Sequence, residues 1–301
     1  MNLLITGAWN NAHKHLSDIQ ALGHDVVFMQ NESDVLPCDP LWIEGVICNG
    51  LFLSHDITDF TNLKYIQLTS AGFDRVPMDY VKAHGIVIHN ARGVYSVPMA
   101  EYAVCGVLQL YKQSRFFAEN QRQRKWEKHR GLLELFGKTV CIVGCGSVGT
   151  ECAKRFSAFG TIVRGVDIEP RQDEHYQAIL PLEELKNEVS VADIVVLTLP
   201  LTQNTHHLFD REMFANMKKS AVLVNIARGA IVDTDALVDA LQSNQLVGAV
   251  LDVFEEEPLF QESNLWDFEN VIVTPHNSFV GDGNDDRLFF LIVSNLKGMY
   301  K

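Results

Sequence analysis

A glycine-rich loop between an apolar run and a helix-compatible segment most constrains how this chain can fold. Gly144, Gly146 and Gly149 stand in the spacing GxGxxG, and the helix opens at Ser147 and Val148. In such a strand–turn–helix unit the first glycine permits the tight turn, the second lets the backbone approach a pyrophosphate, and the third allows close packing of the helix. The helix N-terminus adds free amides and a positive dipole end. The spacing predicts a dinucleotide-binding unit rather than a merely structural glycine turn.

An acidic residue follows at the distance that such a unit requires. Asp167 ends the next apolar run, 18 residues after Gly149. A carboxylate there can accept hydrogen bonds from an adenosine ribose. Its charge would repel a 2′-phosphate, which favours NAD over NADP. Arg171 lies nearby and keeps NADP open as the alternative.

Short apolar runs alternate with helical segments along the whole chain. The first part has runs at 3–6, 26–29, 45–48, 65–68 and 86–89, and the second has runs at 139–143, 162–166, 194–199, 221–225, 248–251 and 271–274. This alternation predicts βαβ units in mostly parallel sheets. We therefore expect an α/β protein of two doubly wound parallel-sheet domains. A Rossmann domain with six strands would cover 95–279, and a smaller flavodoxin-like domain would join 1–94 to 280–301.

Composition and charge exclude other classes of protein. Of the 301 residues, 47% are hydrophobic, enough to offset the entropy of ordering the chain, so a disordered protein is excluded. Apolar runs such as 194–201 fall short of the roughly 20 residues that span a bilayer. A net charge of −13 would repel nucleic acid. The basic run 115–130 is therefore expected to be a solvated helix or an interface arm.

The cysteines and the first residues indicate a reduced, cytoplasmic protein without a metal. The six cysteines form no CxxC pair, which argues against a zinc or thioredoxin-type site. Residues 1–7 have no positive n-region and too short an apolar run for a signal peptide.

Three residues at or just beyond the ends of predicted strands are candidates for chemistry, because ligands bind at the carboxyl ends of strands in open α/β sheets. Arg228 follows the run 222–227, Glu257 comes five residues after Asp252, and His276 follows 273–275. Taken singly, each also fits an ordinary role: a surface arginine, part of a solvated acidic run, or a loop histidine.

Further motifs accompany these residues in a fixed order. They are Gly137-Lys138-Thr139, Leu199-Pro200-Leu201-Thr202 with Asn204-Thr205, Asn225-Ile226-Ala227-Arg228-Gly229, Leu251-Asp252-Val253-Phe254 with Glu257-Pro258, and Thr274-Pro275-His276. In this order the chain resembles the D-isomer-specific 2-hydroxyacid dehydrogenases, which include phosphoglycerate, D-lactate and hydroxypyruvate-type enzymes. The resemblance implies hydride transfer between NAD and a small D-2-hydroxy acid or 2-keto acid. It also makes 95–279 the NAD-binding domain and the other part the substrate domain.

The same resemblance gives the three candidates their roles. Arg228 would clamp the carboxylate and carbonyl oxygen of a 2-keto acid, because a planar guanidinium fits two oxygens at once. His276 would be the acid/base, and Glu257 would orient its imidazole and stabilise the imidazolium. Glu255 and Glu256 are adjacent candidates for this partner, and the interval from Asp252 favours Glu257.

The resemblance also implies, position by position, which residues contact the cofactor and the substrate. Five residues would contact the cofactor: Leu199 and Pro200 beside the adenosine, Thr205 near them, and Ala227 and Asp252 at the nicotinamide. The substrate carboxylate would meet backbone amides of Ser70, Ala71 and Gly72. The alternative for this segment is an ordinary turn.

The chain departs from the family's pattern beside His276 and carries few cations at the expected substrate loops. Asn277-Ser278-Phe279 stand where the family has a small or aliphatic residue followed by Ala or Gly. The loops 49–52 and 70–73 have Arg75 as the one nearby cation. This favours a small, uncharged or apolar side group on the substrate over a phosphate.

Partners and competing functions follow from the same resemblance. Cofactor domains of this family commonly pair, so we expect a homodimer with 116–130 as the dimer arm, and no nucleic acid or membrane partner. Formate dehydrogenases have Gln in place of Glu257, which argues against that activity. An NAD-sensing binding protein of the co-repressor type and a phosphoglycerate dehydrogenase without a regulatory domain remain as alternatives.

Overall fold

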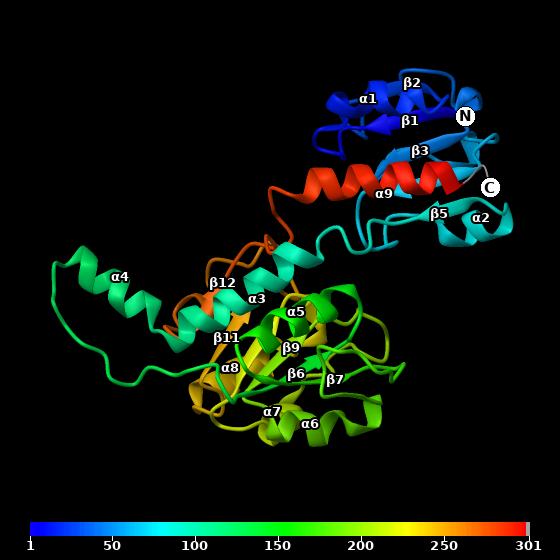
Figure 1. The fold of residues 1–301 in the computed structure, drawn as a ribbon. Coiled ribbons are helices and arrows are strands. Elements are labelled where there is room, and N and C mark those ends of the chain that lie inside the picture. Colours follow the sequence, from blue (N-terminus) through cyan, green and yellow to red (C-terminus); the bar gives the residue numbers. More distant parts are fainter. Residues whose placement is uncertain (299–301) are drawn as a thin grey trace. The chain divides into compact units, whose positions relative to one another are not determined.

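Residues 1–298 are described by the computed structural model (Figure 1), and their contacts divide the chain into two units. Unit 1 takes Met1–Tyr95 together with the segment that starts at Gly281, and unit 2 takes Ser96–Val280. The chain therefore enters unit 2 once and returns to unit 1 once. These boundaries lie one residue from the predicted ones.

Unit 1 is a five-stranded parallel sheet with helices on its faces. Its strands are β1 (Asn2–Thr6), β2 (Asp25–Met29), β3 (Gly45–Cys48), β4 (Tyr65–Leu68) and β5 (Val87–His89), in the order β2-β1-β3-β4-β5. Its helices are α1 (Ala12–Ala21), α2 (Met78–Ala83) and α9 (Asn284–Gly298). Every residue of β3 and β4 is buried, including Gln67, so these runs lack the alternation of a half-exposed strand. Leu288, Ile292 and Leu296 recur every four residues along α9 and pack on the sheet.

Unit 2 is a larger parallel sheet. Its strands are β6 (Thr139–Val143), β7 (Ile162–Val166), β8 (Ala178–Leu180), β9 (Ile194–Leu197), β10 (Val222–Asn225), β11 (Gly248–Leu251) and β12 (Val271–Val273). Its helices are α3 (Ser96–Tyr111), α4 (Ser114–Arg122), α5 (Ser147–Ala158), α6 (Leu185–Val191), α7 (Arg211–Asn216) and α8 (Thr234–Gln242). The sheet order is β12-β11-β10-β9-β6-β7-β8, so the direction of winding reverses between β6 and β9. Two parallel-sheet α/β domains are confirmed.

The prediction of six strands for this sheet was wrong. The seventh strand, β8, pairs with β7 at the edge through only three residues. It follows a polar segment and is too short to stand out as an apolar run. The strand predicted over 194–199 ends at Leu197 in the structure.

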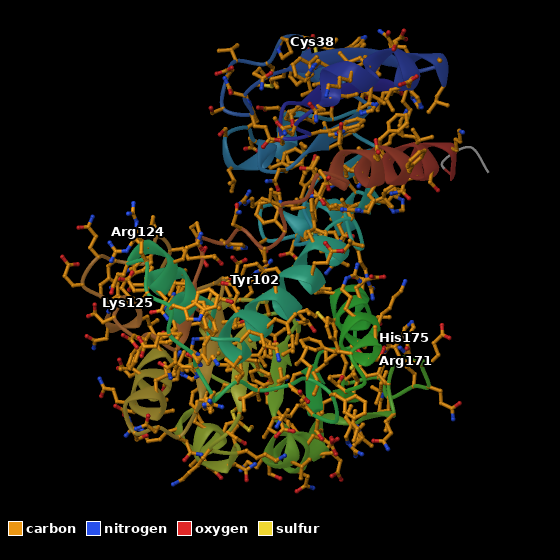
Figure 2. All side chains as sticks on the ribbon, turned by 60° about the vertical axis from the view of Figure 1, so that its left-hand side comes forward. Cys38, Tyr102, Arg124, Lys125, Arg171 and His175 are labelled. Carbon is orange, nitrogen blue, oxygen red and sulfur yellow. The ribbon has the colours of Figure 1, made fainter. Side chains whose placement is uncertain are left out.

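A projecting segment extends from unit 2. α4 and the residues after it stand away from the sheet of this unit (Figure 1). Asn120 is the one buried residue of α4, and all residues from 121 to 128 are exposed. Arg124 and Lys125, which follow α4, lie on this projecting part (Figure 2). We call residues 116–130 the arm.

Residues 1–298 contain neither a membrane-spanning helix nor a group of side chains that could hold a metal ion. No helix there has the length and apolar character needed to cross a membrane. No three or more His, Cys, Asp or Glu residues gather there in a way that could hold a metal ion. The six cysteines lie in this range and are all free thiols.

Candidate active site

The glycine loop connects β6 to α5 and has the backbone that its sequence requires. Gly144 has a φ of +91°, and a Cβ there would lie 2.7 Å from the Cα of Leu199. A Cβ at Gly149 would lie 2.3 Å from the Gly144 carbonyl oxygen. Gly146 is the N-cap of α5, and no side chain caps this helix. The first amides of α5, at Ser147 and Val148, are therefore available to an anionic ligand.

Asp167 and Arg171 both reach the second residue of this loop. The Asp167 carboxylate accepts from the Cys145 amide at 2.6 Å and from the Glu169 amide at 3.0 Å. The Arg171 guanidinium donates to the Cys145 carbonyl oxygen. Arg171 lies on the loop after β7 (Figure 2). A negative and a positive group thus lie together at this loop. In a dinucleotide site, such groups would distinguish a ribose with a 2′-phosphate from one without it.

The segment after β9 closes into a compact turn beside the glycine loop. Thr205 Oγ1 accepts from the Thr202 amide at 2.7 Å and donates to the Pro200 carbonyl oxygen at 2.8 Å. Leu199 is buried and touches the position where Gly144 lacks a side chain. The side chain of Thr205 therefore shapes the turn that carries Leu199 and Pro200.

Arg228 lies on a turn whose backbone is hydrogen-bonded by the buried side chain of Asn225. Asn225, the last residue of β10, accepts from the Ala227 amide at 3.1 Å and donates to the Arg228 carbonyl oxygen at 3.1 Å. The side chain of Arg228 is exposed, and its Nη1 donates to the Ala227 carbonyl oxygen at 2.7 Å. The turn therefore presents the guanidinium while Asn225 satisfies the Ala227 amide and the Arg228 carbonyl.

The turn of Arg228 packs directly against the segment that carries the acidic residues. A Cβ at Gly229 would lie 1.8 Å from the carbonyl carbon of Phe254. Only a glycine permits this approach of the two backbones. The approach fixes the segment 254–257 relative to Arg228.

His276 and Glu257 form a hydrogen-bonded pair. His276 Nδ1 lies 2.8 Å from Glu257 Oε2, and both side chains are partly exposed. Glu257 Oε1 accepts from the Phe254 amide at 3.0 Å, which orients the carboxylate. Because a carboxylate accepts, the neutral ring carries its proton on Nδ1 and leaves Nε2 open. Of the three acidic candidates, Glu257 contacts His276, whereas Glu255 contacts His207.

Asp252 holds the loop that carries His276. Its carboxylate is buried and accepts from the Asn277 amide at 2.7 Å and the Ser278 amide at 2.9 Å. The His276 amide donates to the Asp252 carbonyl oxygen at 2.8 Å. Asp252 therefore has a local structural task in addition to the nicotinamide contact that the resemblance implies.

The segment Ser70-Ala71-Gly72 belongs to unit 1 and follows β4. Its carbonyl groups are occupied: Ser70 accepts from the Ala91 amide at 2.8 Å, and Ala71 accepts from Asn90 Nδ2 at 2.6 Å. Within residues 1–298 we find no hydrogen bond donated by the amides of Ala71 and Gly72. Such amides suit a carboxylate oxygen as an acceptor.

Two further side chains near these residues carried no signal in the sequence. Tyr102 on α3 contacts Thr274, and His207 contacts Glu255. No motif includes Tyr102, and its partner lies 172 residues away in the chain. The positive φ of His207, 50°, is a local signal, but it is visible only in the structure.

Known proteins that resemble this chain identify its family. The family model of the D-isomer specific 2-hydroxyacid dehydrogenase NAD binding domain matches residues 104–278. A glyoxylate reductase from Thermofilum pendens is 36% identical over 248 residues, covering 80% of this chain and 73% of the relative. This chain belongs to the D-isomer-specific 2-hydroxyacid dehydrogenase family.

Solved members of this dehydrogenase family share the whole fold. One from Aeromonas salmonicida superposes with a TM-score of 0.86 at 29% identity, covering 99% of this chain and 95% of the other. A D-lactate dehydrogenase from Aquifex aeolicus, solved with NAD and lactic acid, has a TM-score of 0.80 at 26% identity, covering 99% and 95%. A member from Xanthobacter autotrophicus, solved with NADPH, has a TM-score of 0.79 at 27% identity, covering 98% and 93%. Family members thus include both nicotinamide cofactors.

Proposed function

We propose that this protein transfers hydride between NAD and a small D-2-hydroxy acid or 2-keto acid. The observation that carries the proposal is the hydrogen bond of 2.8 Å between His276 and Glu257. This pair shares a unit with the glycine loop and with the exposed guanidinium of Arg228. A proton donor, its carboxylate partner and a carboxylate clamp are the groups that reduction of a 2-keto acid requires.

The residues of the glycine loop fit a dinucleotide. The uncapped start of α5 at Gly146, Ser147 and Val148 would hold the pyrophosphate. Asp167 would accept from the adenosine ribose, and its charge makes NAD the cofactor we propose over NADP. Leu199, Pro200 and Thr205 would border the adenosine, and Ala227 and Asp252 the nicotinamide. When bound, the nicotinamide supplies or accepts the hydride.

The remaining chemistry belongs to side chains of this chain. Protonated His276 would donate from Nε2 to the carbonyl oxygen of the substrate, and in the oxidative direction the same atom would take the hydroxyl proton. Glu257 would stabilise the imidazolium through Nδ1. Arg228 would bind the carboxylate and carbonyl oxygens and so fix the orientation of the substrate.

The substrate class follows from the charge of the loops in unit 1. We propose that the amides of Ala71 and Gly72, beside Ser70, receive the substrate carboxylate. Arg75 is the one cation close to these loops in the sequence. A single cation suits a small, uncharged or apolar side group better than a phosphate. In this proposal unit 2 is the NAD-binding domain and unit 1 the substrate domain.

A homodimer formed through the arm is part of the same proposal. The arm carries Phe117 and Trp126, which are 38% and 97% exposed. Large apolar side chains at such exposure favour a protein partner. A second copy of the chain is the partner we propose.

The test is NADH oxidation at 340 nm with a panel of 2-keto acids. The panel holds glyoxylate, pyruvate, hydroxypyruvate, 2-ketoisocaproate, phenylpyruvate, oxaloacetate and 3-phosphohydroxypyruvate. We expect turnover of one or two unphosphorylated acids. Turnover of the phosphorylated acid alone would favour a phosphoglycerate dehydrogenase. NADH binding without turnover of any acid would contradict the enzyme and favour an NAD-sensing protein.

The His276→Ala variant tests the assigned proton donor. We expect a loss of turnover of about 100-fold or more, with NADH affinity within twofold, because the ring acts in the chemical step. Full turnover by this variant would contradict the mechanism.

A further inference from the structure

A chain of hydrogen bonds runs from α3 to the loop of His276. Tyr102 lies on α3 and is partly buried (Figure 2). Its phenol oxygen lies 2.6 Å from Thr274 Oγ1, and Thr274 Oγ1 lies 2.6 Å from Asp252 Oδ1. A carboxylate accepts, so Thr274 donates its single proton to Asp252 and Tyr102 must donate to Thr274. Burial raises the pKa of Tyr102, which keeps its hydroxyl protonated as a donor.

Asp252 connects this series of hydrogen bonds to the loop that carries His276. Its side chain is fully buried, and no ion pair joins it to a basic side chain within the described part of the protein. A buried carboxylate of this kind depends on the hydrogen bonds that it accepts. Its donors are the Thr274 hydroxyl and the amides of Asn277 and Ser278. These three donors all belong to the segment 274–278. The segment therefore stabilises the buried carboxylate, and the carboxylate fixes the conformation of the segment.

His276 needs this support because of its backbone. Its φ is +50°, a left-handed value that is uncommon for a residue with a Cβ. Such a conformation persists only where the surrounding structure determines it. The direction of the imidazole follows from the backbone, and the contact of Nδ1 with Glu257 depends on that direction.

We propose that Tyr102 is a positioning residue for His276, acting through Thr274 and Asp252. The inference rests on the proposed role of His276 as the proton donor. Without the phenol O–H, the hydroxyl of Thr274 is free to rotate toward other acceptors, and Asp252 loses a donor. The loop is then held less firmly, and His276 spends less time aligned with Glu257.

Turnover by four variants and one control tests this series of hydrogen bonds. Tyr102→Phe and Thr274→Val each remove one hydroxyl with little change of shape. We expect each to lower kcat about 5- to 20-fold, because a small misplacement of a catalytic group is costly, while the Kd for NADH changes less than twofold. Thr274→Ser keeps the hydroxyl and should lose less than Thr274→Val. The double variant Tyr102→Phe/Thr274→Val should be no slower than Thr274→Val, because both changes interrupt the same series of hydrogen bonds.

Tyr111→Phe is the matched control, because it removes the hydroxyl of the second tyrosine of α3, which is buried. We expect its kcat to equal that of the starting protein. Additive losses in the double variant, or a full kcat for Tyr102→Phe, would overturn the inference. If His276→Ala is inactive while Tyr102→Phe is fully active, only the inference fails and the proposed function stands.

A measurement without substrate separates the two proposals. The ring nitrogens of His276 can be followed by nitrogen NMR, with His276→Gln identifying the signals. In the neutral ring of the starting protein we expect the proton on Nδ1. Tyr102→Phe should increase the fraction with the proton on Nε2, and Tyr111→Phe should not. An unchanged fraction in Tyr102→Phe would overturn the positioning role, even if no acid of the panel is turned over.

Discussion

The guanidinium of Arg228 donates one N–H to its own turn, and its other N–H groups have no hydrogen-bond partner among residues 1–298. Nη1 donates to the Ala227 carbonyl oxygen at 2.7 Å. Arg228→Lys keeps the charge but loses the planar fork that binds two oxygens. We expect KM for the 2-keto acid to rise about 10- to 100-fold, the equivalent of one charged hydrogen bond. Steady-state kinetics measures this, and an NADH titration should give an unchanged Kd. An unchanged KM would show that Arg228 does not contact the substrate.

Asp167 and Arg171 make opposite contributions to the choice of cofactor. Asp167→Ser removes the charge that repels a 2′-phosphate and leaves Arg171 in place. We expect NADH to bind about tenfold more weakly, as for loss of one or two hydrogen bonds, and NADPH to bind more tightly. Fluorescence titration with both cofactors measures the ratio. Arg171→Ala is the matched change and should weaken NADPH. A ratio that moves in neither variant would contradict this assignment.

We expect the buried His24 to make the stability of unit 1 depend on pH. The residue is 4% exposed, and its pKa is lowered from 6.5, first by burial and second by the positive N-terminal amino group. The unfolded chain therefore takes up a proton at a higher pH than the folded chain. As pH falls below 6.5 the free energy of unfolding should decrease, and it should level off below the folded pKa.

His24→Gln should reduce this loss of stability between pH 7.5 and pH 5, because the amide does not titrate. Urea unfolding at both pH values measures the difference. His13→Gln is the control, since His13 lies on the exposed side of α1. An equal loss of stability in His24→Gln and the starting protein would show that His24 does not cause it.

At the scale of elements, the turn from β6 to α5 depends on glycine at two positions. Gly149→Ala would place a Cβ 2.3 Å from the Gly144 carbonyl oxygen, so the backbone of the loop must move. We expect a lower Tm and NADH binding weaker by about tenfold or more, because the amides of α5 lose their alignment. Gly298→Ala is a control, since no other part of residues 1–298 lies within 4 Å of the added Cβ. Normal NADH binding by Gly149→Ala would contradict the assigned pyrophosphate site.

Elements that depend on local patterns could be predicted from the sequence, and elements that depend on distant contacts could not. β3, β4 and β6 are short, largely apolar runs, and the structure begins and ends them at the predicted residues. β8 has three residues and gains its order from pairing with β7, which the sequence does not display. The order of sequence motifs led to the family, which is confirmed.

The residues of the candidate site also divide into those that the sequence indicated and those that only the structure shows. Glu257 stood beside two other glutamates. The interval from Asp252 favoured it, and in the structure it contacts His276, whereas Glu255 contacts His207. Tyr102 gave no signal, because its partner comes from the other end of the same unit. The roles of the site residues stay predictions until the variants are measured.

At the scale of the whole molecule, the arm makes the oligomeric state a direct test. Trp126 is 97% exposed within one chain, so a dimer that covers it should depend on it. We expect Trp126→Glu to change the species seen by light scattering from two chains to one at micromolar concentration. Val35→Glu, at a residue that is 92% exposed in unit 1, is the control. A starting protein that is already a monomer would contradict the dimer arm.

The position of α9 determines when each unit can be completed on the ribosome. The strands of unit 1 are made first, but the face around Leu3 and Ile5 is covered by Leu288, Ile292 and Leu296 of the last helix. At about 5–20 residues per second, the roughly 200 residues between these parts take tens of seconds to translate. Unit 2 is continuous and can fold during that interval. The nascent chain therefore exposes an unfinished apolar sheet, and this is the stage at which a chaperone would have most to protect.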